Sequence, residues 1–259
     1  MTDPVPPRLS ATVLLVRDRP RLEVLMVKRH HQIDFASGAL VFPGGKIDPQ
    51  DSAAAWEGLV HDPEGVDPQE QIVRIAALRE AFEEAGILLA RTSGGAVFTG
   101  DPALAQARKA MAEGRLAFDA LVASFGLKLD LLALQPFARW VTPIYMPKRF
   151  DTHFFLAHAP AEQLAVCDGW ETVDAEWIRP DEALELEKAK ERTIIFPTRM
   201  NLKLLAEAGS AADAVARARS RPRVTVTPWV EKRPSGPVLV IQPDAGYGAV
   251  EEDLASVGG

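Results

Sequence analysis

The sequence has a single cysteine and lacks a long apolar run. Cys167 alone excludes a disulfide within the chain, and no C-x-x-C spacing exists for a metal cluster. No stretch approaches the roughly 18 apolar residues of a membrane-spanning helix. Residues 1–8 are rich in proline and lack the apolar core of a secretion signal, and residues 256–259 carry no peroxisomal address. These absences predict a soluble cytoplasmic protein without a membrane partner.

Positive charge is also scarce in this chain. Its 29 lysines and arginines are outnumbered by 36 aspartates and glutamates, which gives a formal net charge of −7. Such a balance argues against a general binder of nucleic acid or of anionic membranes. An acidic protein that acts on polyphosphates needs metal ions and local cationic side chains to hold them. We therefore expect no nucleic-acid partner, and the sequence leaves a homodimer open.

The chain is long enough to bury a full core, because 47% of its 259 residues are hydrophobic. It can form one large domain, or one domain with an extension. Two β-rich runs, residues 9–16 and 22–27, are joined by a charged turn and predict an antiparallel hairpin. Further strands are scattered among helical stretches. This order predicts an α/β fold in which helices cover both faces of a mixed sheet.

Residues 71–85 contain neither proline nor glycine and many helix formers, so they predict a helix that Gly86 ends. At about 100° per residue, Leu78 and Phe82 share the face expected to pack on the core.

The other side of this helix carries acids. Glu80 and Glu84 are four residues apart and share a face, and Arg79 is spaced to pair with Glu83. Taken alone, an acidic run of this kind predicts a solvated helix face with one ion pair. The longer pattern around it favours a functional interpretation.

Residues 79–87, with the sequence REAFEEAGI, resemble the second half of the Nudix hydrolase signature, R-E-U-x-E-E-x-G-U, in which U is a bulky aliphatic residue. Upstream, residues 42–48 resemble the first half, a strand end that runs into a glycine-rich loop. The resemblance implies the Nudix α/β/α sandwich, a small-molecule diphosphate substrate, and structural roles in the motif for Arg79 and Gly86.

The chain departs from this signature in spacing and in two residues. Residues 45 and 79 are 34 positions apart, where the family pattern has 14, so the box contains an insertion. The glutamate expected eight positions before Arg79 is Gln71, and Ala81 is small for its place. We expect the sandwich core to lie outside the insertion, residues 49–70, which would then be a lid or a mobile loop with Trp56 as an anchor.

The expected layout has four parts besides that insertion. Residues 1–8 are expected to form a flexible tail, and residues 9–208 the Nudix domain. Residues 102–126 would form a helical insertion over one edge of the active site. Residues 209–259 would be a C-terminal extension packed on the domain.

The resemblance implies a site for Mg²⁺ or Mn²⁺. Its ligands would be the carboxylates of Glu80 and Glu84 and the main-chain carbonyl of Gly44, because such ions prefer oxygen ligands. Glu80 would also serve catalysis, and Glu83 is either a further ligand or the partner of Arg79. A base or extra ligand in Nudix chains usually comes from a later glutamate. Glu171 is the candidate here, with a solvated turn acid as the alternative.

The substrate prediction rests on a narrower resemblance, to Nudix proteins that cleave coenzyme A and acyl-CoA. Those proteins include peroxisomal animal members and bacterial relatives, and the likeness covers roughly residues 9–205. Residues 38–45, GALVFPGG, and residues 149–155 carry it. It implies that Arg29, Arg149 and Gly45 contact the substrate.

The predicted activity is thus divalent-metal-dependent cleavage of the diphosphate of CoA or acyl-CoA, giving 3′,5′-ADP and phosphopantetheine or its acyl form. A diphosphatase for ADP-ribose, NADH or another nucleoside diphosphate derivative is the alternative within the enzymes. A binding or regulatory module with the Nudix fold and weak catalysis is the alternative outside them.

Overall fold

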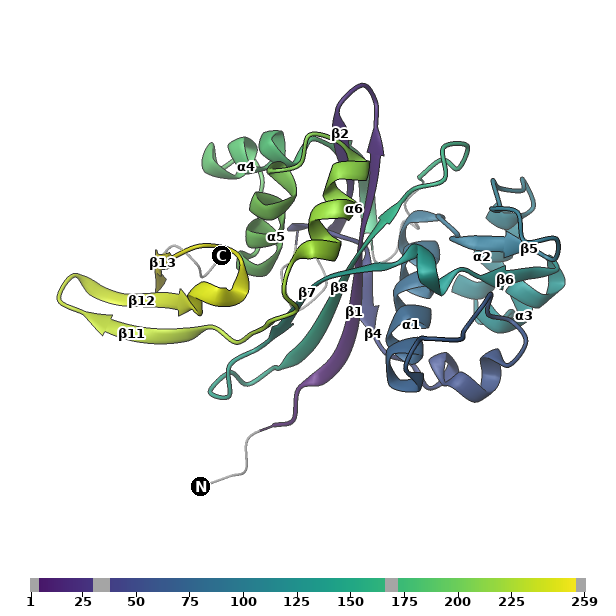
Figure 1. Cartoon of the computed structure of the whole chain (residues 1–259), viewed down its shortest axis with the longest axis horizontal. Coiled ribbons are helices and arrows are strands. Elements are labelled where there is room, and N and C mark those ends of the chain that lie inside the picture. The colour runs from purple at the N-terminus through teal and green to yellow at the C-terminus, as the bar shows by residue number, and fades with distance from the viewer. Residues whose placement is uncertain (1–4, 30–37, 166–171, 255–259) are drawn as a thin grey trace.

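A mixed β-sheet forms the centre of the computed structural model, which describes residues 5–29, 38–165 and 172–254 (Figure 1). Within these residues, eight strands belong to the sheet, and six of them follow the order β10-β7-β8-β1-β2-β3. In addition, β4 pairs with β1, and β9 pairs with β2. The bounds are β1 (Arg8–Asp18), β2 (Leu22–Arg29), β3 (Leu40–Val41), β4 (Gly44–Lys46), β7 (Gln135–Val141), β8 (Phe150–His158), β9 (Thr172–Ile178) and β10 (Thr225–Val226).

Strand direction makes the sheet mixed. The pairs β1–β8 and β10–β7 are parallel, whereas β1–β2, β1–β4, β2–β9 and β7–β8 are antiparallel. The expected hairpin at the start of the chain is therefore confirmed, as is the α/β fold with a mixed sheet.

Both faces of the sheet are buried, because β1 alternates between two hydrophobic clusters. Val13 and Leu15 belong to the cluster beneath α1, while Leu14 and Val16 belong to the cluster beneath α5 and α6. Each of these four side chains is fully buried. The alternation follows the two-residue period of a strand and places helices on both sides of one sheet.

Two groups of elements cover the sheet, one on each side (Figure 1). One group holds α1 (Pro68–Ala85), α2 (Leu104–Ala112), α3 (Phe118–Ser124) and a small sheet of β5 (Ala90–Thr92) and β6 (Leu127–Leu129). The other holds α4 (Pro180–Lys188), α5 (Phe196–Ala206), α6 (Ala211–Ser220) and a second sheet of β11 (Trp229–Arg233), β12 (Gly236–Ile241) and β13 (Val250–Asp253). Short 3₁₀ helices complete the fold: η1 (Pro49–Asp51), η2 (Ala53–Trp56), η3 (Leu131–Ala133) and η4 (Pro243–Ala245).

Helix α1 ends where the sequence predicts and begins earlier. Gly86 is left-handed with φ of 72°, and its N–H donates to carbonyls of the preceding turn. At the other end, Asp67 is the N-cap, and its side chain accepts the Gln69 N–H at 2.8 Å. Pro68 is tolerated at the first helical position because the N–H it lacks would have no partner there.

The insertion in the box is part of the core, so the expectation that the core lies outside it is wrong. Trp56 is 2% exposed, and its ring contacts that of Phe118 at 5.3 Å between centroids. Its indole N–H donates to the Gln50 carbonyl at 2.9 Å. Val60 and Val66 are also buried, since the segment lies against α1, α3 and β6. This segment is therefore anchored at Trp56 and Val60.

The C-terminal segment also enters the main architecture. Strand β10 pairs with β7 at the edge of the central sheet, and α6 buries Ala211, Ala214 and Ala218 in the second cluster. Tyr247 is hydrogen-bonded to both Trp140 and Asn201. Since β10 is one of its strands, this segment contributes directly to the sheet.

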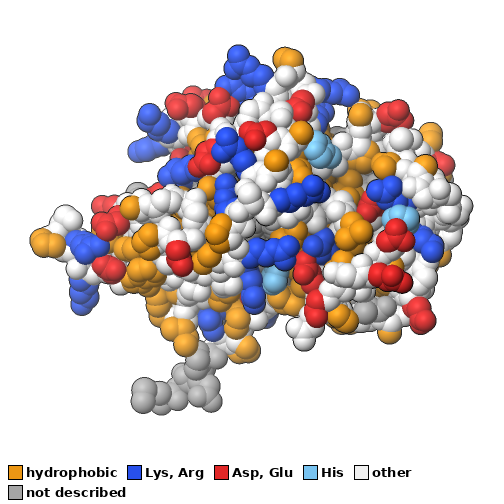
Figure 2. Space-filling model, in the orientation of Figure 1, with side chains coloured by type: hydrophobic (Ala, Val, Ile, Leu, Met, Phe, Trp, Pro, Cys, Tyr) orange, Lys and Arg blue, Asp and Glu red, His pale blue; other side chains and the backbone are white. Residues whose placement is uncertain are grey.

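The surface carries both signs of charge. In Figure 2, basic and acidic side chains lie among one another over the visible face. Many form ion pairs, such as Arg139 with Asp151 at 2.7 Å and Arg217 with Asp213 at 3.0 Å. Among the residues that the structure describes, no helix is both long and apolar enough to cross a membrane.

Candidate active site

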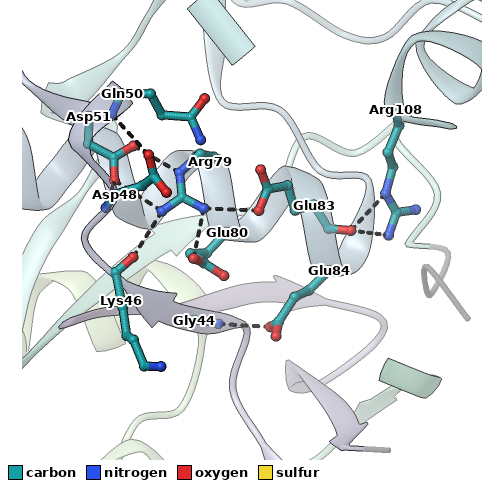
Figure 3. Close-up of polar contacts among 10 residues, drawn as sticks. All are labelled: Gly44, Lys46, Asp48, Gln50, Asp51, Arg79, Glu80, Glu83, Glu84 and Arg108. Atoms are coloured by element: carbon teal, nitrogen blue, oxygen red, sulfur yellow. Dashed lines mark hydrogen bonds and ion pairs between the residues drawn. The ribbon is translucent and has the colours of Figure 1, made fainter. Parts of the chain in front are cut away.

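The acidic turn of α1 faces the glycine-rich strand β4 (Figure 3). Glu80 and Glu84 are 7% and 3% exposed, so both carboxylates are almost fully buried. The Gly44 N–H donates to Glu84 Oε2 at 2.9 Å. A Cβ on Gly45 would lie 2.5 Å from Glu80 Cδ, and one on Gly44 would lie 2.5 Å from Thr12 Oγ1. Glycine is required at both positions because α1 and β1 approach β4 so closely.

Arg79 organises the acids around it. Its N–H groups donate to five acceptors: Asp51 Oδ1 and Oδ2 at 2.8 and 3.0 Å, Glu80 Oε1 at 2.8 Å, Glu83 Oε2 at 2.9 Å and the Lys46 carbonyl at 2.9 Å. Burial would lower the pKa of Arg79, but the hydrogen bond to Asp51 and the charges of Glu80, Asp51 and Glu83 together raise it above its ordinary value. This guanidinium is therefore a permanent cation that holds two of the motif's acids in place.

Asp51 was missed by the sequence prediction, which assigned the place of the motif's upstream acid to Gln71. Asp51 is fully buried and binds Arg79 through both of its oxygens. Gln71 instead donates to the Val66 carbonyl at 3.0 Å. A pattern with 14 positions from glycine to arginine, and its acid eight positions before the arginine, places that acid six positions after Gly45, which is residue 51. Counting forward from Gly45 would have found Asp51, and the inserted residues follow it.

Glu83 lies between the buried network and solvent. Its side chain is 35% exposed, and the predicted ion pair with Arg79 is confirmed. Its main-chain carbonyl accepts two hydrogen bonds from Arg108 of α2, from Nε at 2.9 Å and from Nη2 at 2.6 Å. The sequence prediction placed α2 near one edge of the site but did not single out Arg108, because no local pattern marks a contact across 25 positions.

The other predicted site residues stand apart from this cluster or lie outside the described structure. The Arg149 side chain donates to the Thr142 and Val5 carbonyls at 3.1 and 2.7 Å, where it joins the β7–β8 turn to the start of the chain. Arg29 ends β2, but its side chain lies outside the described part of the structure, as does the whole of Glu171. Substrate contacts by Arg29 and Arg149, and a base at Glu171, stay predictions.

The acidic turn also lies outside a cavity that opens on the first half of α1. That cavity, about 430 Å³, is lined by the first half of α1 at Glu70 and Val73 and by Arg139 and His153 of the sheet. Neither Glu80 nor Glu84 lines it. The two acids of this turn therefore do not face that cavity.

The donor set suits a hard divalent cation with few protein ligands. Among the described residues, no cluster of three or more His, Cys, Asp or Glu side chains has the arrangement of a complete metal site. Two buried carboxylates nevertheless lie one helical turn apart, one held by Arg79 and the other by the Gly44 N–H. Mg²⁺ commonly takes one or two carboxylates and completes its shell with water and substrate phosphate. Glu80 and Glu84 fit that pattern; the predicted use of the Gly44 carbonyl stays a prediction.

Comparisons with known proteins identify relatives of this chain. The family model described as the NUDT19 Nudix domain matches residues 61–205. The human protein named acyl-coenzyme A diphosphatase NUDT19 is 30% identical over an alignment that covers 73% of this chain and 62% of that protein. A Caenorhabditis elegans protein named putative nudix hydrolase 7 is 28% identical, with 69% and 53% covered. This chain thus spans 53% to 62% of the length of the curated relatives it matches.

Among solved structures, a NUDIX hydrolase from Alicyclobacillus acidocaldarius is similar over nearly its whole length. Its crystal structure superposes with a TM-score of 0.72 at 32% sequence identity, and the match covers 82% of this chain and 96% of that one. At this similarity the two chains share both the fold and a recognisable sequence.

Proposed function

Because this chain belongs to the Nudix hydrolase family, in its NUDT19 branch, we propose that it is a pyrophosphohydrolase that cleaves the diphosphate of CoA or of an acyl-CoA. The products would be 3′,5′-ADP and phosphopantetheine or its acyl form. The acyl-CoA diphosphatase name belongs to relatives longer than this chain, and it supports the substrate class proposed here.

The observation that carries the proposal is the buried pair of Glu80 and Glu84 against the glycines of β4. Arg79 lies beside this pair and donates a hydrogen bond to Glu80. Buried carboxylates are costly unless cations or hydrogen bonds compensate them. A divalent cation bound at this pair would add to the compensation that Arg79 and the Gly44 N–H already give. A domain that only binds a ligand has no need of the full set of acids.

Mg²⁺ or Mn²⁺ is the proposed cofactor, held by Glu80 and Glu84. When bound, such an ion supplies positive charge to a diphosphate and acidifies water at neutral pH. The chain's own contribution is orientation. Arg79 holds Glu80 from one side, and the Gly44 N–H holds Glu84 from the other.

Hydrolysis then needs a group that accepts a proton and a path along which a water can reach the phosphorus. The oxygen of a water forms a bond to one phosphorus, the P–O–P bridge breaks, and the proton of that water passes to a carboxylate. Glu171 is the predicted proton acceptor. Of the three glutamates on the acidic turn of α1, Glu83 has the most exposed side chain, at 35%, and is the second candidate. Because the chemistry needs little covalent participation, positioning and charge dominate the rate.

A substrate panel tests the proposal. CoA, acyl-CoA, dephospho-CoA, ADP-ribose, NADH and nucleotide sugars are compared by kcat/KM under identical Mg²⁺ and again under Mn²⁺. CoA differs from dephospho-CoA in its 3′-phosphate, and a bidentate arginine contact to phosphate is worth about ten- to hundredfold. We expect kcat/KM for CoA to exceed that for dephospho-CoA by about that factor. Arg29→Ala should reduce the ratio of the two values.

Two outcomes would reject the CoA assignment. Faster cleavage of ADP-ribose than of CoA would establish the other diphosphatase function. No metal-dependent turnover of any diphosphate would establish a binding or regulatory module instead.

A further inference from the structure

Both inserted segments contact α1 near the acidic turn. Trp56 of the first insertion contacts Phe118 of α3, which in turn stacks on Phe82 of α1 at 5.9 Å between ring centroids. Asp51, which immediately precedes the inserted residues, binds Arg79 of α1. Arg108 of α2 reaches the same turn from the other end (Figure 3). Asp51 and the two insertions together therefore contact the helix that carries the acids at three places.

We propose that Arg108 is a positioning residue for the hydrolase. Through the main-chain carbonyl of Glu83 it fixes the last turn of α1, and it thereby sets turnover rather than substrate affinity. This inference rests on the proposed pyrophosphohydrolase function. Arg108 acts through the backbone, without a contact to substrate.

The Glu83 carbonyl accepts two hydrogen bonds from Arg108, while nearby backbone donors are used elsewhere. The last carbonyls of a helix have no partner within the helix. After α1, the Gly86 N–H donates to Phe82 at 2.9 Å and the Ile87 N–H donates to Ala81 at 3.4 Å. The Leu88 N–H donates to the side chain of Gln163 at 2.8 Å. Arg108 supplies two hydrogen bonds where those N–H groups do not reach.

The location of this carbonyl gives the contact its consequence. Glu83 holds Arg79 through its side chain, and the next residue, Glu84, accepts the Gly44 N–H. A guanidinium at the C-terminal end of a helix is also favoured by the helix dipole. Loss of Arg108 removes two hydrogen bonds from the turn that carries two acids, so that turn unwinds or shifts more readily. A displacement of about 1 Å of a catalytic group costs on the order of a hundredfold in rate.

The test compares Arg108→Met with a matched control on the same helix. Lys109→Met removes a cation of α2 that is exposed and one residue away, without touching the Glu83 carbonyl. Arg108→Lys keeps a charged donor. For each variant, kcat and KM are measured with CoA and Mg²⁺ at a temperature well below unfolding. Amide hydrogen exchange of residues 79–88 is measured on the resting protein.

For Arg108→Met, we expect kcat to fall about ten- to hundredfold while KM stays within about threefold. Exchange in residues 79–88 should be faster than in the Lys109→Met control, and Arg108→Lys should recover much of the loss. Equal kcat and equal exchange in Arg108→Met and Lys109→Met would overturn the proposal. So would a rise in KM at unchanged kcat, which would make Arg108 a substrate contact. If the wild type cleaves no CoA, the proposed function fails, and the exchange comparison still decides whether Arg108 holds the turn.

Discussion

Asp51→Ala should destabilise the protein far more than an alanine elsewhere in the same turn. Asp51 is fully buried and accepts three hydrogen bonds, from Arg79 Nε at 2.8 Å, Arg79 Nη2 at 3.0 Å and the Asp48 N–H at 2.7 Å. Arg79 itself is 4% exposed, so water does not readily replace the lost carboxylate. Removing one partner of such a buried pair typically costs about 3–5 kcal/mol.

The matched control is Asp48→Ala. Asp48 lies three positions earlier, is exposed, and caps η1 by accepting the Gln50 N–H at 3.0 Å. Loss of a cap of this kind costs about 1 kcal/mol. At about 2–4 °C per kcal/mol for a domain of roughly this size, Asp51→Ala should lower Tm by about 6–20 °C and the control by only a few degrees.

Thermal unfolding followed by circular dichroism measures both variants. Turnover measured at low temperature should also fall in Asp51→Ala, because Arg79 loses the partner that orients it toward Glu80 and Glu83. Tm values within about 2 °C of each other for the two variants would refute the assignment of Asp51 as the buried partner of Arg79.

Other substitutions test the remaining parts of the site and core. Glu84→Gln should lower metal-dependent turnover by orders of magnitude while Tm stays near that of the wild type; near-normal turnover would contradict a metal-holding role. Gly45→Ala should reduce turnover, because the new Cβ would displace the Glu80 carboxylate, and unchanged kcat would show that this close approach is unimportant. Trp56→Ala should cost about 3–5 kcal/mol of unfolding free energy, measured in urea, as for other buried aromatic residues; a loss below about 1 kcal/mol would restore the view of the insertion as a loop outside the core. Burial, and then the charge of Arg139, lower the pKa of His153, while Asp151 and Glu70 oppose the shift. The contribution of neutral His153 to stability is therefore fully present above its unfolded pKa and is lost as the pH falls. His153→Gln should flatten the decline in Tm between about pH 7 and pH 5. An unchanged decline would show that His153 does not cause it.

Local features of the sequence predicted much of the catalytic helix. The end of α1 at Gly86 and the Arg79–Glu83 pair follow from spacings of a few residues, which the 3.6-residue period converts directly into contacts. The hairpin of β1 and β2 is likewise local. Such contacts need no knowledge of the rest of the fold.

Contacts between segments far apart in the sequence could not be predicted from local spacing. Asp51 and Arg79 are 28 positions apart, and the insertion between them hides the pairing from a count made backward from the arginine. The insertion is rich in Asp, Pro and Gly, which suggests a mobile loop, yet Trp56 and Val60 find apolar partners on α3 and β6. The insertion is ordered because it packs on a surface formed by other segments of the chain. The composition of the insertion alone does not predict that packing.

Identification of the products of acyl-CoA turnover tests the central claim most directly. Acyl-CoA is incubated with the protein and Mg²⁺, and the products are separated by chromatography and identified by mass spectrometry, with Glu84→Gln in parallel. We predict 3′,5′-ADP and acyl-phosphopantetheine in equal amounts, and neither product from the variant. Release of free CoA and fatty acid, which would mean thioester cleavage, or intact acyl-CoA under conditions that consume ADP-ribose, would contradict it.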